Sequence, residues 1–239
     1  MKQIMTALLT GCLLASCAAG MLQVSGDHTV TGYTQVEDSP ITRSLFSDKS
    51  STISEENIQR ILTGHYELPQ ELRVAIVKLE STQRQGRSYY WTDESYMKSQ
   101  QAYLDSFTAM LKDSRRVSTV SIVPDLLISA NPTFTIIREA AVRTQSDIVL
   151  VYSIASDIYS NYRLFSKPEV KAFATTQCIV LDVRTGLIPF STIITKDFHT
   201  IKQKEEFSDS EMVNRAKNGA IQLTIEEIGK QVMKFLSME

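Results

Sequence analysis

The hydrophobic positions in the first part of this chain alternate between strand-like and helix-like segments. Mostly apolar runs rich in β-branched residues at 72–80, 117–123 and 147–154 predict strands. The run at 147–154 is apolar at consecutive positions, which is typical of a central strand covered on both faces. Between these runs, apolar side chains at helical spacing predict helices over 92–114 and 134–145.

The second part of the chain predicts a hairpin followed by a long helix. Residues 170–183 and 187–200 read as two long strands around Arg184-Thr185-Gly186, where Gly186 can take the positive φ that a three-residue hairpin requires. A broad apolar stripe over 208–238 predicts the helix. The order β-α-β-α-β-β-β-α predicts an α/β fold with a three-layer-like mixed sheet. Right-handed crossovers make its first half parallel, and the C-terminal hairpin extends it antiparallel.

The amino terminus carries the pattern of an export signal. Lys2 precedes about a dozen mostly apolar residues, a stretch too short to span a bilayer core, which needs about 20 residues. The stretch ends in Leu14-Ala15-Ser16-Cys17, which resembles the bacterial lipobox, so we expect cleavage before Cys17 and acylation of its thiol and new amine. Cys12 also follows a lipobox-like sequence, but the apolar region before it is very short. An ordinary secretory signal is the other alternative.

These segments predict the domain organisation. Residues 1–16 are a lipoprotein signal peptide, 17–53 comprise the lipidated cysteine and a flexible Ser/Thr/Gly-containing tether, and 54–239 form one domain with its core from about 71. Three acyl chains would anchor the protein to a membrane, since each buried methylene contributes about 0.8 kcal/mol. Residue 18 is Ala rather than the Asp associated with inner-membrane retention, which favours the outer membrane of a Gram-negative envelope. We expect the domain to lie in the periplasm.

Composition and charge narrow the function classes further. Hydrophobic residues make up 43% of the chain and charged residues 22%, as in ordinary soluble domains, which excludes a disordered or polytopic chain. The formal net charge is −2, so no basic field favours nucleic acid as a partner. After signal cleavage Cys178 is the sole unmodified cysteine, and one thiol cannot form an internal disulfide.

Motifs for catalysis or cofactor binding are missing from the sequence. It contains no Gly-x-Gly-x-x-Gly, phosphate-loop or Gly-x-Ser-x-Gly pattern, and its three histidines are isolated from one another and from acids at ligand spacing. Cys178 and His199 are the one nucleophile–base pair to consider. The hairpin register places Cys178 opposite residues 191–192, over about 20 Å from His199 at roughly 3.4 Å per residue. We therefore expect no enzyme activity, no catalytic residue, no metal and no cofactor.

An aromatic cluster is the candidate binding site. Loops that follow parallel strands gather at the carboxyl edge of a sheet, where α/β folds usually bind ligands. The segments 86–91 and 157–165 should both emerge there, and Tyr, Trp and Arg are enriched at protein-contact hot spots. The alternative is that these aromatics cap the end of the core. The candidate partner-binding residues are Tyr89, Tyr90, Trp91, Tyr159, Tyr162, Arg163 and Phe165.

Several of these features together resemble a known group of proteins. The lipobox, the linker, Val-Ser-Thr-Val-Ser-Ile-Val-Pro-Asp at 117–125, the strand at 147–154 and the Leu-Asp-Val-Arg-Thr-Gly hairpin at 181–186 look like bacterial lipoproteins with a CsgG-like (curli secretion channel-like) domain. The layout is closest to the rhombotarget lipoproteins. The resemblance implies a periplasm-facing domain of an outer-membrane lipoprotein and brings no catalytic residues.

Three functions follow from these observations. The first is a non-enzymatic lipoprotein that binds an envelope protein, or itself, in envelope assembly or secretion. The second is a subunit of a CsgG-like secretion pore, against which the connection 157–169 counts because it is too short and carries Asp157, Arg163 and Lys167. The third is a lipoprotein that binds a small ligand or glycan at the same edge.

Overall fold

A computed structural model describes residues 40–46, 53–79, 94–128, 132–161, 169–204, 206 and 208–238, and every structural statement below concerns these residues. From residue 72 onward its helices and strands follow the predicted order, with one short 3₁₀ helix added. The elements are α1 (Glu55–Thr63), β1 (Leu72–Leu79), α2 (Glu94–Lys112), β2 (Val117–Ile122), a short 3₁₀ helix η3 (Asp125–Leu127), α3 (Phe134–Arg143), β3 (Ile148–Asn161), β4 (Glu169–Asp182), β5 (Phe190–Ile201) and α4 (Asp209–Leu236).

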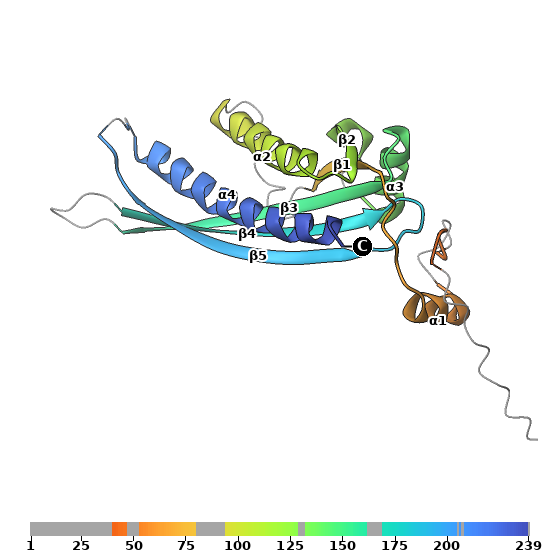
Figure 1. Cartoon of the computed structure of the whole chain (residues 1–239). Helices are drawn as coiled ribbons and strands as arrows, with labels where there is room; N and C mark the ends of the chain where they lie inside the picture. The colour runs from red at the N-terminus through yellow and green to blue at the C-terminus, as the bar shows by residue number, and fades with distance from the viewer. Residues whose placement is uncertain are drawn as a thin grey trace, which may run out of the picture. The chain divides into compact units, whose positions relative to one another are not determined.

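One mixed sheet organises the domain, with the strand order β2-β1-β3-β4-β5 (Figure 1). Strand β1 lies parallel to both β2 and β3, whereas β4 lies antiparallel to both β3 and β5. Gly186 has a φ of +75° in the β4–β5 turn, as the hairpin prediction required. The predicted α/β class, with a parallel first half, an antiparallel second half and a long C-terminal helix, is confirmed.

Helices cover the two faces of the sheet unequally. Helices α2 and α4 pack on one face, where Phe107, Tyr152 and Ile228 belong to the larger apolar core (Figure 1). Helix α3 packs on the other face, where Ile137 contacts a smaller core that includes Val149. That smaller core draws on the ends of β1, β3 and β4 nearest α3. The sheet is therefore sandwiched between helices at one end alone.

Strand β3 is longer than its sequence predicts. It continues past residue 154 to Asn161 and pairs throughout with β4, from Ile148↔Asp182 to Asn161↔Glu169. The prediction that residues 157–161 belong to a loop is therefore wrong. Ile154 and Ile158 pack against the core under α4, while Asp157 faces the other way and is exposed. The side chains of β3 are apolar on both faces where α3 covers the sheet. Beyond α3 they alternate between positions that face the core and positions that face away from it.

Helix α1 has a cap residue at each end. The Ser54 hydroxyl accepts a hydrogen bond from the Asn57 amide, and Gly64 follows the last helical residue. Residues 40–46 belong to the segment predicted as a tether, and they contact this helix. The Asn57 side-chain amide donates to the Leu45 carbonyl at 2.8 Å. The Ile41 amide donates to the His65 carbonyl at 3.4 Å.

Helix α4 is the longest element, with 28 residues, but acids and bases occur along its whole length. Of the helices that the structure describes, none combines the length and the apolar character needed to cross a membrane.

Candidate functional site

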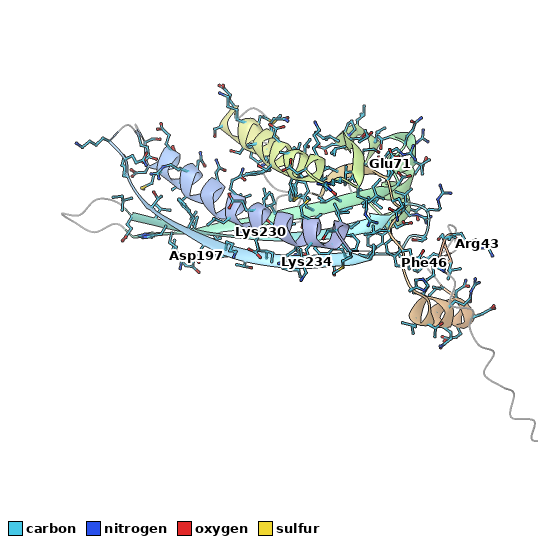
Figure 2. All side chains as sticks on the ribbon, viewed as in Figure 1. Arg43, Phe46, Glu71, Asp197, Lys230 and Lys234 are labelled. Carbon is cyan, nitrogen blue, oxygen red and sulfur yellow. The ribbon has the colours of Figure 1, made fainter. Side chains whose placement is uncertain are left out.

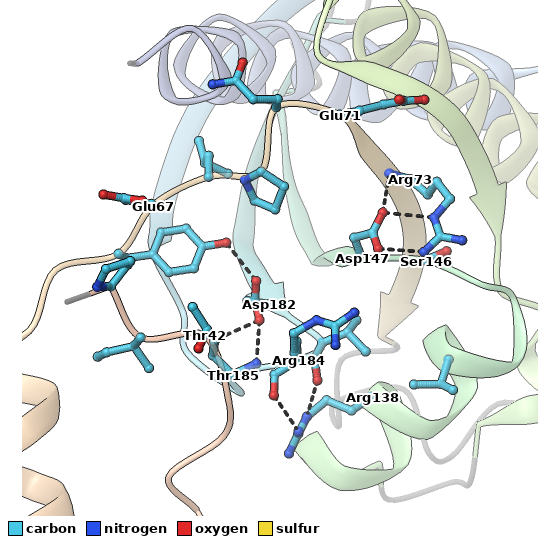
Figure 3. Close-up of a pocket in the computed structure, with 18 of the residues that line it drawn as sticks. Thr42, Glu67, Glu71, Arg73, Arg138, Ser146, Asp147, Asp182, Arg184 and Thr185 are labelled. Atoms are coloured by element: carbon cyan, nitrogen blue, oxygen red, sulfur yellow. Dashed lines mark hydrogen bonds and ion pairs between the residues drawn. The ribbon is translucent and has the colours of Figure 1, made fainter.

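One hollow lies at the amino edge of the parallel strands, opposite the edge that the sequence predicts. It has a volume of about 1130 Å³. Its walls come from residues 40–42, from 66–73 leading into β1, from the end of α3 and from the β4–β5 turn (Figure 3). The sequence does not indicate this hollow, because residues 40–42 belong to the predicted tether and the turn at 184–186 predicts a hairpin alone.

Asp182 is the most buried carboxylate of this hollow, and each of its oxygens is bonded. Oδ1 accepts hydrogen bonds from the Thr185 amide at 2.6 Å and the Thr185 hydroxyl at 2.7 Å. Oδ2 accepts a hydrogen bond from the Tyr66 hydroxyl at 2.9 Å (Figure 3). Burial, followed by the charge of Asp182, raises the pKa of Tyr66 far above its usual value. Asp182 therefore holds the β4–β5 turn and ties it to the segment before β1.

Three further charged side chains of the hollow, Arg73, Asp147 and Arg138, are also bonded within the fold. Arg73 and Asp147 form a two-pronged ion pair with distances of 2.7 and 3.0 Å, and the Arg73 hydrogen bond is the largest cause of a lowered Asp147 pKa. The Arg138 guanidinium donates to the Val183 carbonyl at 2.9 Å and the Arg184 carbonyl at 3.4 Å. Because these polar groups bond within the fold, the amino-edge hollow is best explained as a structural contact between the segment before β1, the end of α3 and the β4–β5 turn.

The second candidate is the sheet surface that helices leave uncovered, which we call the open face. It is the side of β3, β4 and β5 opposite α4, beyond the reach of α3, and Figure 2 shows Asp197 of β5 on that side. The outward positions alternate with buried ones along β4 and with half-buried ones along β5. The open face comprises Ala155, Asp157, Tyr159, Glu169, Lys171, Phe173, Thr175, Gln177, Ile193, Thr195, Asp197, His199 and Ile201.

Neighbouring side chains on the open face contact one another across the strands. Lys171 pairs with Asp197 at 3.1 Å, and His199 lies 2.7 Å from Glu169 on the neighbouring strand, a contact that the linear sequence does not indicate. The Tyr159 and Phe173 rings stack with centroids 5.9 Å apart. Three large apolar side chains nevertheless remain solvent-exposed: Ile193 by 67%, Tyr159 by 66% and Ile201 by 49%.

Strand β5 forms one edge of the sheet. Among the described residues it pairs with β4 alone, so the backbone groups on its outer side lack a strand partner along 12 residues. Such an edge is a template for pairing with another chain unless it is covered or protected. The open face and the β5 edge are continuous, since Ile193 and Ile201 belong to both.

The structure describes one residue of the predicted aromatic cluster, Tyr159. Tyr159 lies on the open face in β3. The last residue of β1, Leu79, pairs with Ser153 of β3, and Tyr159 is six residues beyond Ser153. At about 3.4 Å per residue, Tyr159 is therefore about 20 Å past that end of β1 rather than beside it. The other predicted residues lie outside the part of the chain that the structure describes. They are Tyr89, Tyr90, Trp91, Tyr162, Arg163 and Phe165.

Cys178 lies where the hairpin register predicts. It pairs with Thr192, whereas His199 pairs with Lys171, seven residues further along β5. The Cys178 side chain is 1% exposed, and burial raises the pKa of its thiol to about 12. The residue fills a position in the core under α4.

This burial predicts an inert thiol in the folded domain. At pH 8 a thiol with a pKa of about 12 is roughly 1000-fold less ionised than an ordinary cysteine, and the thiolate is the reactive form. We expect Cys178 to react with Ellman's reagent at least about 1000-fold more slowly in native protein than in guanidinium. Equal rates in the two solvents would contradict the assigned burial.

Comparisons with known proteins show a distant likeness in fold. No protein-family model matches the chain, and no curated protein matches its sequence. The hypothetical protein CT253 from Chlamydia trachomatis is 12% identical with a TM-score of 0.43, covering 70% of this chain and 98% of that one. Lipoprotein GNA1162 from Neisseria meningitidis is 11% identical with a TM-score of 0.34, covering 66% and 98%. The LpoB C-terminal domain from Salmonella enterica is 10% identical with a TM-score of 0.27, covering 58% and 90%.

The structure is thus distantly similar in fold to solved bacterial proteins that include a lipoprotein, and the likeness is one of fold alone. These values define no family for the chain.

Proposed function

We propose that this chain is a non-enzymatic lipoprotein anchored by acyl chains on Cys17 in the outer membrane of a Gram-negative envelope. Its domain lies in the periplasm and binds a protein partner in envelope assembly or secretion. The lipobox at 14–17 supports the anchor. The observation that carries partner binding is the β5 edge, which no other described strand pairs with over its 12 residues and which borders a sheet face that no described helix covers.

The β5 edge suits a partner that adds an extended strand. Strand addition takes its affinity from backbone hydrogen bonds and its specificity from alternate side chains. Every second residue of β5 is exposed, which gives a partner strand a regular set of neighbours. Ile193 and Ile201 offer apolar contacts near the two ends, while Asp197 between them favours a partner with a basic or hydrogen-bonding side chain at that position.

The CsgG-like resemblance favours the secretion-pore alternative. One observation of the structure supports it and another counts against it. Strands β3, β4 and β5 have 14, 14 and 12 residues. They are long enough to span a membrane, since a spanning strand needs about 9–11 residues. The open face, however, carries Asp157, Lys171 and Asp197, all exposed. A Lys facing lipid near the bilayer midplane costs about 2–4 kcal/mol, so partner binding in water is the better explanation.

A charge placed on the β5 edge should block the proposed contact. We expect Ile193→Lys to reduce the yield of a specific crosslinked partner, isolated after formaldehyde treatment of intact cells, at least about tenfold. Ile193 is 67% exposed, so its replacement should leave the melting temperature unchanged.

Leu126→Lys is the matched control, because Leu126 is 95% exposed in η3 and lies outside the open face. The control should retain the wild-type yield. An Ile193→Lys protein that captures the same partner at the same yield would contradict the proposal, as would equal losses in both variants.

A further inference from the structure

The outward row of side chains along β5 contains an acid and a base close together. Asp197 and His199 are two residues apart, so both point to the open face. Both side chains are more than half exposed. Within the chain each contacts a residue of β4, Asp197 through Lys171 and His199 through Glu169. The acid and the base are therefore accessible to a strand added at the β5 edge.

A second copy of β5 can pair with the first in a limited set of registers. Two identical antiparallel strands are related by a two-fold axis that passes between the two copies of one central residue. Residues equally far from the centre, on opposite sides of it, then lie opposite each other and point to the same face. Strand β5 runs from Phe190 to Ile201, so central positions 193 to 198 keep at least three paired residues on each side.

Charge selects one of these registers. Centring at Lys196 places two lysines opposite each other, and centring at Asp197 places two aspartates opposite each other, and both arrangements are unfavourable. Centring at 193, 194 or 195 places Asp197 opposite an uncharged residue. Centring at Phe198 places Asp197 of each copy opposite His199 of the other. In this register the charges of β5 are complementary to those of a second β5.

The acid and the base each keep an atom for this contact. His199 contacts Glu169 through Nε2, which leaves its Nδ1 on the other side of the ring. Asp197 contacts Lys171 through Oδ2, which leaves its Oδ1. Pairing about Phe198 joins these contacts into a row of alternating acids and bases across four strands. The row comprises Glu169 and His199 of one copy followed by Asp197 and Lys171 of the other.

Helix α4 leaves room for the second copy on the other face of the sheet. It lies over both β4 and β5 (Figure 1). Neighbouring strands are about 4.8 Å apart, so the α4 helices of two copies joined at β5 lie about 10 Å apart, close to the 8–10 Å of packed helices. Leu223 is 37% exposed and precedes Glu227 by one turn, and the Glu227 carboxylate lies 3.9 Å from Lys196 of β5. A second α4 would cover this apolar side chain.

We propose that the partner at the β5 edge is a second copy of this chain, paired antiparallel about Phe198 so that Asp197 of each copy bonds to His199 of the other. The proposal rests on the proposed function, which places the contact at this edge, and it names the occupant. Two five-stranded sheets then become one continuous sheet. Copies anchored in the same membrane meet at a high effective concentration, which favours so short a strand pairing.

Cysteine crosslinking in intact cells tests this register. Two differently tagged full-length chains, one Thr195→Cys and the other Ile201→Cys, are expressed together and exposed to a mild oxidant. Positions 195 and 201 are directly opposite in the register about Phe198, with Cβ atoms about 4.5–5.5 Å apart, so we expect a disulfide between the two tags. Thr195→Cys expressed alone should give no dimer, because its two copies lie six residues apart, about 20 Å.

A charge reversal tests the complementarity. Asp197→Lys in both tagged chains places a lysine opposite His199 of the second copy and should reduce the disulfide yield at least about tenfold. Asp157→Lys is the matched control, because Asp157 is an exposed open-face residue of β3, which β4 separates from β5. The control should keep the original yield. Both positions are exposed, so neither change should unfold the domain.

Three outcomes would overturn the proposal. They are no disulfide between the two tags, a dimer of equal yield from Thr195→Cys alone, and an unchanged yield in Asp197→Lys. A photocrosslinker at position 193 separates these failures from failure of the proposed function. A product with a different protein would leave partner binding at the β5 edge standing without self-pairing, whereas no product at all would contradict partner binding itself.

Discussion

Cys17→Ser removes the protein from the outer-membrane fraction if the amino terminus is processed as its sequence predicts. The serine cannot take a thioether-linked lipid, and cleavage before residue 17 by the lipoprotein route is lost with it. Three acyl chains, each contributing about 0.8 kcal/mol per buried methylene, would disappear together. None of the described helices can replace them as a membrane span.

Cys12→Ser provides the control for this experiment. It leaves the sequence Leu14-Ala15-Ser16-Cys17 intact, so the protein should stay in the membrane fraction and its amino-terminal peptide should carry the lipid mass. Release by Cys12→Ser with retention by Cys17→Ser would move the anchor to Cys12. Retention in both single variants and in the double variant would refute lipid anchoring.

Phe107→Ala should produce the largest loss of stability in the domain. Phe107 is 0% exposed on the inner side of α2, and its ring centroid lies 4.6 Å from that of Tyr152. Removing a buried phenyl ring leaves a cavity in the core under α2 and α4, which costs about 3–5 kcal/mol. Urea unfolding followed by circular dichroism measures this loss as a lower midpoint.

Phe134→Ala is the matched substitution on the surface. Phe134 is 54% exposed in α3, so the same change should cost under about 1 kcal/mol. Equal losses in the two variants would mean that α2 does not pack on the sheet as described.

The sequence predicts most of the fold because its strongest patterns coincide with its best-buried elements. The apolar run 147–154 corresponds to the part of β3 between α3 and the helices of the other face, where Val149 and Leu150 are both buried. Gly186 marks the β4–β5 turn because a positive φ strongly favours glycine. The hairpin register follows from that turn, and it places Cys178 opposite Thr192.

The end of β3 could not be predicted from the sequence. Asp157 and Asn161 are turn-forming residue types, and the sequence therefore predicts that the strand ends before them. Long-range pairing with β4 decides their conformation, since residues 157–161 match 173–169 one for one. Strand propensity depends on such neighbours more than on the residue itself.

The candidate sites could likewise be predicted only in part from the sequence. The alternation within residues 190–201 is visible in the sequence, but neither the edge position of β5 nor the bare face beside it can be read from one strand. Both depend on where α3 and α4 pack, which is a property of the whole sheet.

The direct test of partner binding is site-specific photocrosslinking in intact cells. A benzoylphenylalanine at position 193, on the exposed side of β5, should crosslink to one discrete envelope protein in an otherwise wild-type chain. The same group at position 126, which is more exposed but lies in η3, should give no such product. A discrete product from 193 alone is the predicted result. Position 193 without a product, or with the same product as position 126, would contradict strand addition at the β5 edge.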